Sequence, residues 1–149
     1  MTHIPRRFVV PAVLLSLTLA ACTPPAGSSA GTPEPTVTTV GRTPVEAGQA
    51  FLTTYVDGDG RVVRHDQGGD TVSEGQAYGM LIAVALGDEA TFASIWNWTR
   101  ENLQRPDGLL SWRWVDGAVA DPQPASDADL DAALALALAG EAFDDPTWT

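Results

Sequence analysis

Residues 73–86 restrict the fold of this chain most strongly, because they combine a helix-start motif with a long uncharged run. Ser73 followed by Gln76 three residues later is a capping-box pattern, and residues 77–86 contain no charged side chain. A helix that is apolar on all sides must be buried. The sequence therefore predicts a buried helix with the Glu74 carboxylate at its first position.

A second segment repeats this pattern. Ser126 and Asp127 precede an Ala/Leu-rich run that continues to Gly140. We therefore expect a second buried helix, which begins with a Ser cap and carries Asp127 at its first helical position. In this interpretation Asp129 completes the cap.

Two further helices are predicted, and both are apolar on one side only. One begins at Thr43 and Pro44 and ends before residues 57–60; the other is capped by Asp88 and runs to about Gln104. Because the connections between the four helices are short, helices that follow each other in the chain should run antiparallel. The first and third are then outer helices, and the second and fourth are inner helices.

This alternation makes the two inner helices parallel, with both N-termini at the same end. If their axes lie about 8–10 Å apart, as in packed helices, Glu74 and Asp127 stand roughly 6.5–9.5 Å apart. Inverting glycosidases use that separation to place a water molecule. The alternative is that the two carboxylates only complement the dipoles of their helices.

A short β-hairpin is predicted in the connection between the third and fourth helices. Leu110, Trp112 and Trp114 alternate in the sequence, and Asp116-Gly117 supplies a turn. Flat aromatic faces of this kind can stack on sugar rings, and alternating Trp residues also form protein cores. We therefore expect Trp112 to contact a substrate and Trp114 to pack inside the protein.

The first 42 residues are interpreted as targeting and spacer segments. Residues 1–21 contain two arginines and an apolar run, which is typical of a signal peptide, and Cys22 stands where a bacterial lipoprotein is lipidated. An ordinary secretory signal with an incidental Cys is the alternative. Residues 22–42 are rich in Thr, Pro, Gly and Ser and predict a flexible linker. The folded domain is then 43–149, in a secreted protein anchored to the outer face of the cell membrane through Cys22.

Composition excludes some classes of partner. With 19 acidic and 8 basic residues, the chain has a formal net charge of −11, which repels nucleic acid and anionic lipid headgroups. His65 has no companion His or Cys at metal-ligand spacing, so no metal and no cofactor are expected. We also expect a monomer.

Six short blocks of the chain match the motifs of a known family. They are Asp59-Gly60-Arg61-Val62-Val63, residues 71–80, Trp98-Thr99, Asn102-Leu103, Trp112-Arg113-Trp114 and residues 125–129. In these blocks the chain resembles glycoside hydrolase family 8, the endoglucanase and chitosanase family, over residues 51–143. The resemblance implies an all-α fold, an (α/α)6 barrel of alternating inner and outer helices, cleavage of β-1,4-linked glycans with inversion, and no metal.

The resemblance also implies roles for individual residues. It makes Glu74 the proton donor and Asp127 the second catalytic carboxylate. In one description Asp127 is the nucleophile; in another it binds the sugar, and the base is a further Asp from the C-terminal half of the family domain. A complete barrel needs about twelve helices, and this chain supplies about four. We therefore expect the first third of the barrel, in a truncated sequence.

The residues that we expect to contact substrate surround these two carboxylates. They are Trp112, Tyr78, Gln76, Asp129 and Arg61. Tyr78 lies one helical turn from Glu74 and faces either the cleft or the core, and Arg61 is alternatively a salt-bridge partner near the helix mouth.

The predicted activity is therefore endo-acting, inverting hydrolysis of a β-1,4-linked polysaccharide of the cellulose, β-glucan or chitosan type. The alternatives are a non-catalytic glycan-binding lipoprotein and an inactive fragment of such an enzyme.

Overall fold

The computed structural model describes residues 41–148. The predicted signal peptide, Cys22 and all but the last two residues of the predicted linker lie outside this range. Within it, no helix combines the length and the hydropathy needed to cross a membrane.

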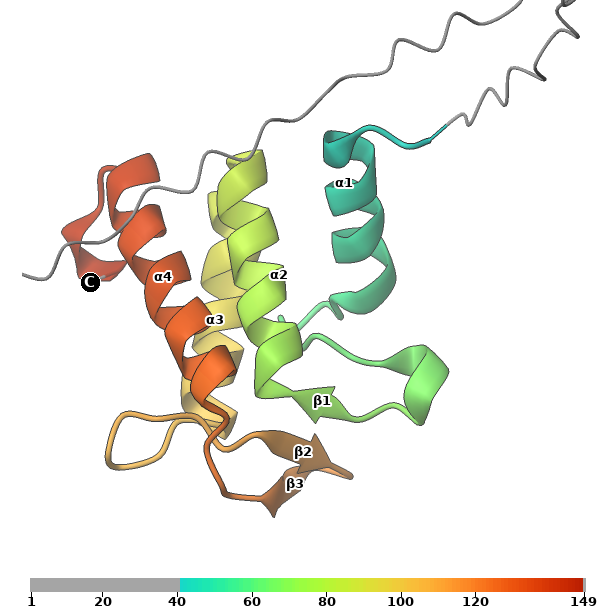
Figure 1. The fold of residues 1–149 in the computed structure, drawn as a ribbon, viewed down its shortest axis with the longest axis vertical. Helices are drawn as coiled ribbons and strands as arrows, with labels where there is room; N and C mark the ends of the chain where they lie inside the picture. Colours follow the sequence, from blue (N-terminus) through green and yellow to red (C-terminus); the bar gives the residue numbers. More distant parts are fainter. Residues whose placement is uncertain (1–40, 149) are drawn as a thin grey trace, which may run out of the picture. The chain divides into compact units, whose positions relative to one another are not determined.

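Four α-helices account for most of the described structure (Figure 1). They are α1 (Pro44–Tyr55), α2 (Ser73–Leu86), α3 (Glu89–Asn102) and α4 (Ser126–Ala142). Two short 3-10 helices, η1 (His65–Gln67) and η2 (Pro146–Trp148), follow α1 and α4. Helix α2 contacts each of the other three helices, so it is the central helix of the four.

Both predicted outer helices begin at the caps that the sequence indicates. At α1, the Thr43 hydroxyl accepts a hydrogen bond from the backbone N–H of Glu46, and the Glu46 carboxylate accepts one from the Thr43 N–H. At α3, the Asp88 carboxylate accepts a hydrogen bond of 3.0 Å from the Thr91 N–H. These bonds satisfy N–H groups that have no partner within the helix.

The predicted caps of α2 and α4 are wrong. Each helix begins one residue earlier, at Ser73 and Ser126, and neither has a side-chain cap. The Ser73 N–H instead donates to the backbone carbonyl of Trp112 at 2.9 Å. Trp112, which directly precedes a strand, thus provides the acceptor that the capping box assigns to the Gln76 side chain. Glu74 and Asp127 consequently occupy the second helical positions rather than the first.

A three-stranded antiparallel sheet lies beside the start of α2. Strand β2 (Arg113–Val115) pairs with β3 (Ala118–Asp121) to form the predicted hairpin, and it also pairs with β1 (Thr71–Val72), which was not predicted. The hairpin turn contains Asp116 at φ 49° and Gly117 at φ 83°. Both residues have a left-handed backbone conformation, as tight two-residue hairpin turns require.

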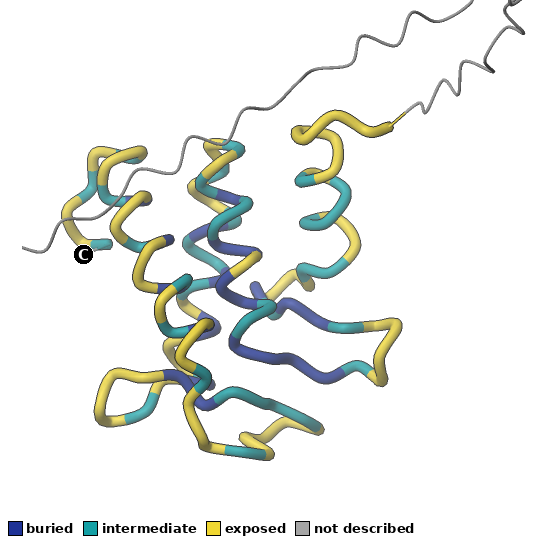
Figure 2. Tube along the Cα trace, in the orientation of Figure 1, coloured by how far each residue is buried: buried dark blue, intermediate teal, exposed yellow. Residues whose placement is uncertain are grey.

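The core lies between α2, α3 and α4. Its largest fully buried side chains are Phe92, Met80, Ile95 and Leu103. Small residues on the facing side of α4, among them Ala132 and Ala135, allow this helix to pack closely on α2. Figure 2 shows an unbroken buried stretch in the segment that leads into α2, whereas buried and half-buried residues alternate along most of the helix itself.

The prediction that α4 is buried on all sides is wrong. Leu130, Leu134 and Leu138 are 71%, 50% and 40% exposed and form one row, since they are spaced by four residues. Only the alanine side of the helix enters the core. We call this exposed row, Leu130, Leu134 and Leu138, the leucine ridge.

Candidate active site

Helices α2 and α4 pack side by side and run parallel (Figure 1). Both begin at the end of the layer next to the small sheet, because β1 leads into α2 and β3 leads towards α4. The prediction of two neighbouring parallel helices with their N-termini at one end is therefore confirmed. Glu74 and Asp127 lie in the first turns of these helices, at the same end of the structure.

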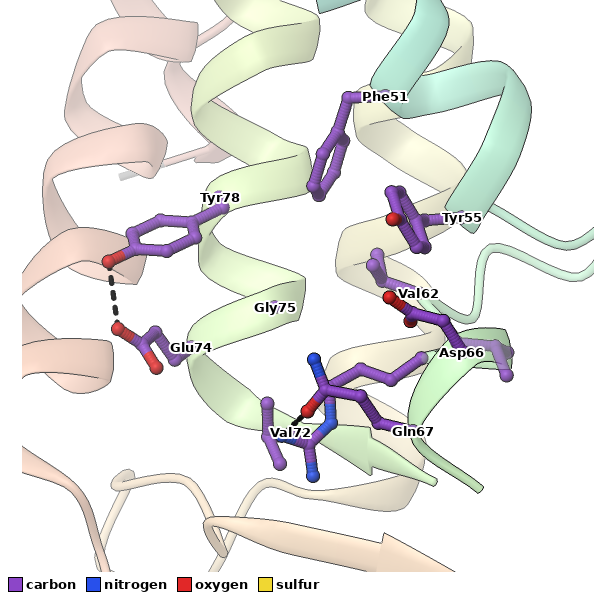
Figure 3. A pocket seen from close by; sticks show the side chains of 11 residues that line it. Phe51, Tyr55, Val62, Asp66, Gln67, Val72, Glu74, Gly75 and Tyr78 are labelled. Atoms are coloured by element: carbon purple, nitrogen blue, oxygen red, sulfur yellow. Dashed lines mark hydrogen bonds between the residues drawn. The ribbon is translucent and has the colours of Figure 1, made fainter. Parts of the chain in front are cut away.

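Glu74 has a defined side-chain partner. The Tyr78 hydroxyl donates a hydrogen bond of 2.8 Å to Glu74 Oε1 (Figure 3). Tyr78 is 43% exposed, so it faces outwards, and the alternative placement in the core is excluded. The bond occupies one oxygen of the Glu74 carboxylate.

The first turn of α4 contributes further negative charge near this pair. The pKa of Tyr78 is raised above its ordinary value of 10.0, chiefly by the hydrogen bond to Glu74 and by the charge of that carboxylate. The charges of Asp131 and Asp127 raise it further. Asp127 itself is exposed, and its Oδ1 accepts a hydrogen bond of 2.9 Å from the Ala128 N–H. Carboxylates of both α2 and α4 therefore raise the pKa of the same Tyr78 hydroxyl.

A groove of about 420 Å³ extends from Glu74 and Tyr78 across α2 towards α1. Figure 3 shows the Glu74–Tyr78 pair on one side of α2 and the rings of Phe51 and Tyr55 on the other. Gly75 lies between them and leaves the surface of the helix open.

Trp112 is a half-buried aromatic side chain that lies next to the start of α2 and is held at several points. Its backbone N–H donates to the Gln123 carbonyl, and its own carbonyl accepts from the Ser73 N–H, both at 2.9 Å. Its indole donates to the Asp121 carboxylate, and this bond contributes most to a lowered pKa of Asp121. Trp114 instead packs edge-on against Trp98, with ring centroids 5.5 Å apart. The prediction that Trp114 packs inside the protein is therefore confirmed.

Sequence reasoning missed a buried ion cluster beneath this region. The Asp70 side chain is 3% exposed and accepts hydrogen bonds from Arg64 at 2.7 and 2.6 Å and from Arg113 at 2.9 Å. The hydrogen bonds from Arg64 contribute most to holding the pKa of Asp70 below its ordinary value of 3.8, and those from Arg113 add to this effect. The available signal was the position of Asp70 directly before the segment that leads into Glu74.

Gln76 lies too deep to contact a substrate. Its side chain is fully buried; the amide oxygen accepts from the Val62 N–H, and the amide nitrogen donates to the Thr99 hydroxyl at 2.7 Å. The expectation that Gln76 binds substrate is therefore corrected: Gln76 connects α2 to α3 and to the segment before it.

Arg61 and Asp129 also hold the protein together. Arg61 was expected to contact substrate or, alternatively, to form a salt bridge. It donates to the Thr71 hydroxyl at 2.8 Å and to the Gly69 carbonyl at 2.7 Å, and both are hydrogen bonds to uncharged groups of the same loop. Asp129 accepts from the Leu110 N–H at 2.8 Å, so it anchors the loop before the hairpin and does not complete the cap of α4. In both residues the bonded side-chain groups serve protein contacts.

Metal ligation finds no support in this part of the chain. Among residues 41–148, no group of three or more His, Cys, Asp and Glu side chains is placed to hold a metal ion. His65 lies 3.3 Å from an oxygen of Asp57, as part of an exposed pair.

Comparison with known proteins identifies the family. Residues 37–149 match the model of glycosyl hydrolases family 8. A probable endoglucanase of Novacetimonas hansenii is 47% identical over 102 residues, which cover 66% of this chain and 30% of the relative. An endoglucanase of Pseudomonas fluorescens is 36% identical, over 67% of this chain and 27% of its own length.

Solved structures agree with this match. An endo-beta-1,4-glucanase from Acetobacter xylinum superposes with a TM-score of 0.67 at 44% identity, over 70% of this chain and 34% of that one. A family 8 endoglucanase from Klebsiella pneumoniae gives 0.65 at 32% identity, over 69% and 34%. These relatives are (α/α)6 barrels, so the predicted partial barrel is confirmed. The chain spans about 30% of the length of the curated relatives that it matches. The chain belongs to glycosyl hydrolases family 8.

Proposed function

We propose that this chain provides part of the active site of an endo-acting enzyme that hydrolyses β-1,4-linked glucan with inversion. Glu74 is the proton donor and Asp127 is the second carboxylate of the site. The observation that carries this proposal is the placement of both carboxylates in the first turns of adjacent parallel helices, at one end. The names of the matched relatives, endoglucanases in the majority, support the substrate class.

The chemistry requires two carboxyl groups with different tasks. Glu74 transfers a proton to the glycosidic oxygen as the bond to the anomeric carbon breaks, and a water molecule attacks that carbon from the opposite face. The hydrogen bond from Tyr78 holds Glu74 Oε1, which leaves Oε2 for the glycosidic oxygen. Asp127 acts on the same sugar, either on the attacking water or on the ring.

Trp112 and Tyr78 are the proposed contacts with the glycan. The indole of Trp112 offers a flat apolar surface beside the start of α2, where a sugar ring stacks. Tyr78 is exposed next to Glu74 and completes the rim with a hydroxyl that can also meet a sugar hydroxyl.

The test is hydrolysis of soluble carboxymethyl-cellulose by the complete protein, with the anomeric configuration of the first product followed by proton NMR. We expect α-configured reducing ends from the β-linked substrate, and a loss of about 10²- to 10⁴-fold in kcat for Glu74→Gln. Glu89→Gln is the matched control, because Glu89 is an exposed acid in the first turn of α3.

Two results decide against the proposal. Retained activity in Glu74→Gln removes the proton-donor role. Binding of the polysaccharide without hydrolysis by the unaltered protein favours the non-catalytic glycan-binding protein instead.

We also propose that the protein is exported and anchored by a lipid on Cys22. The support is the sequence pattern, with two arginines, an apolar run and then a Cys in the first 22 residues. We expect Cys22→Ser to move the protein from the membrane fraction to the soluble exported fraction. Unchanged fractionation of this variant indicates an ordinary secretory signal.

A further inference from the structure

We propose that Asp70 and Arg113 form a positioning pair that holds the Trp112 indole at a fixed orientation relative to Glu74. This inference rests on the proposed function, because it assigns these two residues to the glycan platform of the same site. Neither residue touches the reacting atoms; both act through Trp112.

Asp70 is built as a fixed point. Its side chain is almost completely buried, and Arg64 and Arg113 both donate to its Oδ2, at 2.6 and 2.9 Å. A buried carboxylate with two guanidinium partners is costly to displace, because any movement leaves charges unpaired in the protein. Asp70 also directly precedes β1, the strand that leads into α2 and Glu74.

Arg113 connects this fixed point to Trp112. Its Nε donates to Asp70, while the carbon of its guanidinium lies 5.7 Å from the centroid of the Trp112 ring. A guanidinium at this distance over an indole is attracted to the ring face. The same side chain therefore contacts both the buried anchor and one face of the proposed platform, and a sugar stacks on the opposite face.

The backbone places the platform next to the proton donor. Val72 pairs with Arg113 across the β1–β2 ladder, and the Ser73 N–H donates to the Trp112 carbonyl. These contacts fix the Trp112 backbone beside Ser73, the residue before Glu74. They leave the Trp112 side chain free to rotate. The Arg113 guanidinium restrains this rotation, because its carbon lies 5.7 Å from the centroid of the Trp112 ring. Such preorganisation lowers the entropic cost of sugar binding.

The experiment is a double-mutant cycle in the complete protein, with Arg113→Met, Trp112→Ala and the double variant. Arg113→Met removes the guanidinium but leaves the Asp70–Arg64 pair intact, so the buried carboxylate keeps a partner. KM and kcat are measured on a soluble β-1,4-glucan, and Kd for cellohexaose is measured by calorimetry. Arg100→Met is the matched control, because Arg100 is exposed on α3 and donates a hydrogen bond to Asn97 of the same helix.

We expect Arg113→Met to raise KM and Kd about threefold to tenfold with little change in kcat, and to have no further effect once Trp112 is Ala. An unchanged KM and Kd in Arg113→Met, or effects that multiply in the double variant, overturns the positioning role. If the unaltered protein binds cellohexaose without hydrolysing glucan, the proposed catalysis fails, and the Kd cycle still decides the role of Arg113. Absence of both binding and hydrolysis overturns both proposals.

Discussion

Helices α2 and α4 have similar compositions but different surroundings. Helix α2 contacts all three other helices and buries large side chains such as Met80. Helix α4 packs closely on α2 through small residues, whereas the leucine ridge on its other side is exposed. An Ala/Leu-rich helix therefore need not be buried on every side: the number of elements packed around it decides how much of its apolar surface leaves water.

The N-terminal turns of the two helices differ in the same direction. Glu74 is half-buried and accepts the Tyr78 hydroxyl, beside a strand and a buried ion cluster. Asp127 is exposed and accepts a hydrogen bond from the backbone of its own helix, at the Ala128 N–H. The more enclosed carboxyl group suits proton donation, because a surrounded group can be held in one orientation towards a leaving oxygen. These differences between α2 and α4 can be tested by substitution.

Met80→Ala should show the largest effect on stability, because Met80 is fully buried in the centre of α2. Truncation loses apolar contacts and leaves a cavity, so we expect the free energy of unfolding to fall by about 2–5 kcal/mol. Denaturant-induced unfolding followed by circular dichroism measures this change. A loss below about 1 kcal/mol contradicts the central position of α2.

Asp70→Asn should destabilise the protein in a pH-dependent way. The pKa of Asp70 is lowered in the folded state, so its contribution is fully present above the ordinary value of 3.8 and is lost as pH falls through the folded value. We expect a loss of about 1–3 kcal/mol at pH 7, because Arg64 and Arg113 lose their charged partner and the buried amide forms weaker hydrogen bonds than the carboxylate. The difference between wild type and variant should shrink in acid. A difference that stays constant down to pH 2 argues against the ion cluster as its source.

Tyr78 should titrate above the ordinary tyrosine range. The chain contains two tyrosines, so Tyr55→Phe leaves Tyr78 as the one phenol to follow by ultraviolet absorbance. We expect Glu74→Gln to lower its pKa most and Asp127→Asn to lower it less, following the order of their contributions. The matched control is Glu141→Gln, at the opposite end of α4, which should leave it unchanged. No response to Asp127→Asn contradicts an electrostatic contribution of Asp127 at Tyr78.

Leu134→Ala should show the smallest effect on stability. Leu134 is half-exposed in the middle of the leucine ridge, and Leu and Ala both favour helices. We expect the free energy of unfolding of this chain to change by no more than about 0.5 kcal/mol. A loss as large as that of Met80→Ala means that another part of the molecule covers the ridge.

Local signals in the sequence predicted the features that depend on local contacts. The caps at Thr43 and Asp88 were predictable because donor and acceptor lie three residues apart. The start of α2 was not, since the Ser73 N–H is satisfied by the carbonyl of Trp112, which is 39 residues away in the sequence and directly precedes β2. The same holds for the Asp70–Arg113 bond, which joins residues 43 positions apart.

The sequence predicted the two carboxylates of the candidate site and the helices that carry them. It did not predict the contacts that hold the surrounding residues in place. Parallel α2 and α4, with Glu74 and Asp127 in their first turns, followed from the expected alternation of helix direction, although only the α2–α3 connection is short and residues 56–72 and 103–125 separate the other helices. Gln76 was expected to contact substrate, but its burial and its bond to Thr99 place it inside the protein. Polarity alone does not show which way a side chain points.

The measurement that tests the central claim most directly compares the hydrolysis rates of Glu74→Gln, Asp127→Asn and the double variant in the complete protein. If both carboxylates serve one site, each single variant should lose about 10²-fold or more in kcat/KM, and the double variant should be no slower than the slower single variant. Wild-type activity in either single variant, or losses that multiply in the double variant, contradicts a shared active site at the N-termini of α2 and α4.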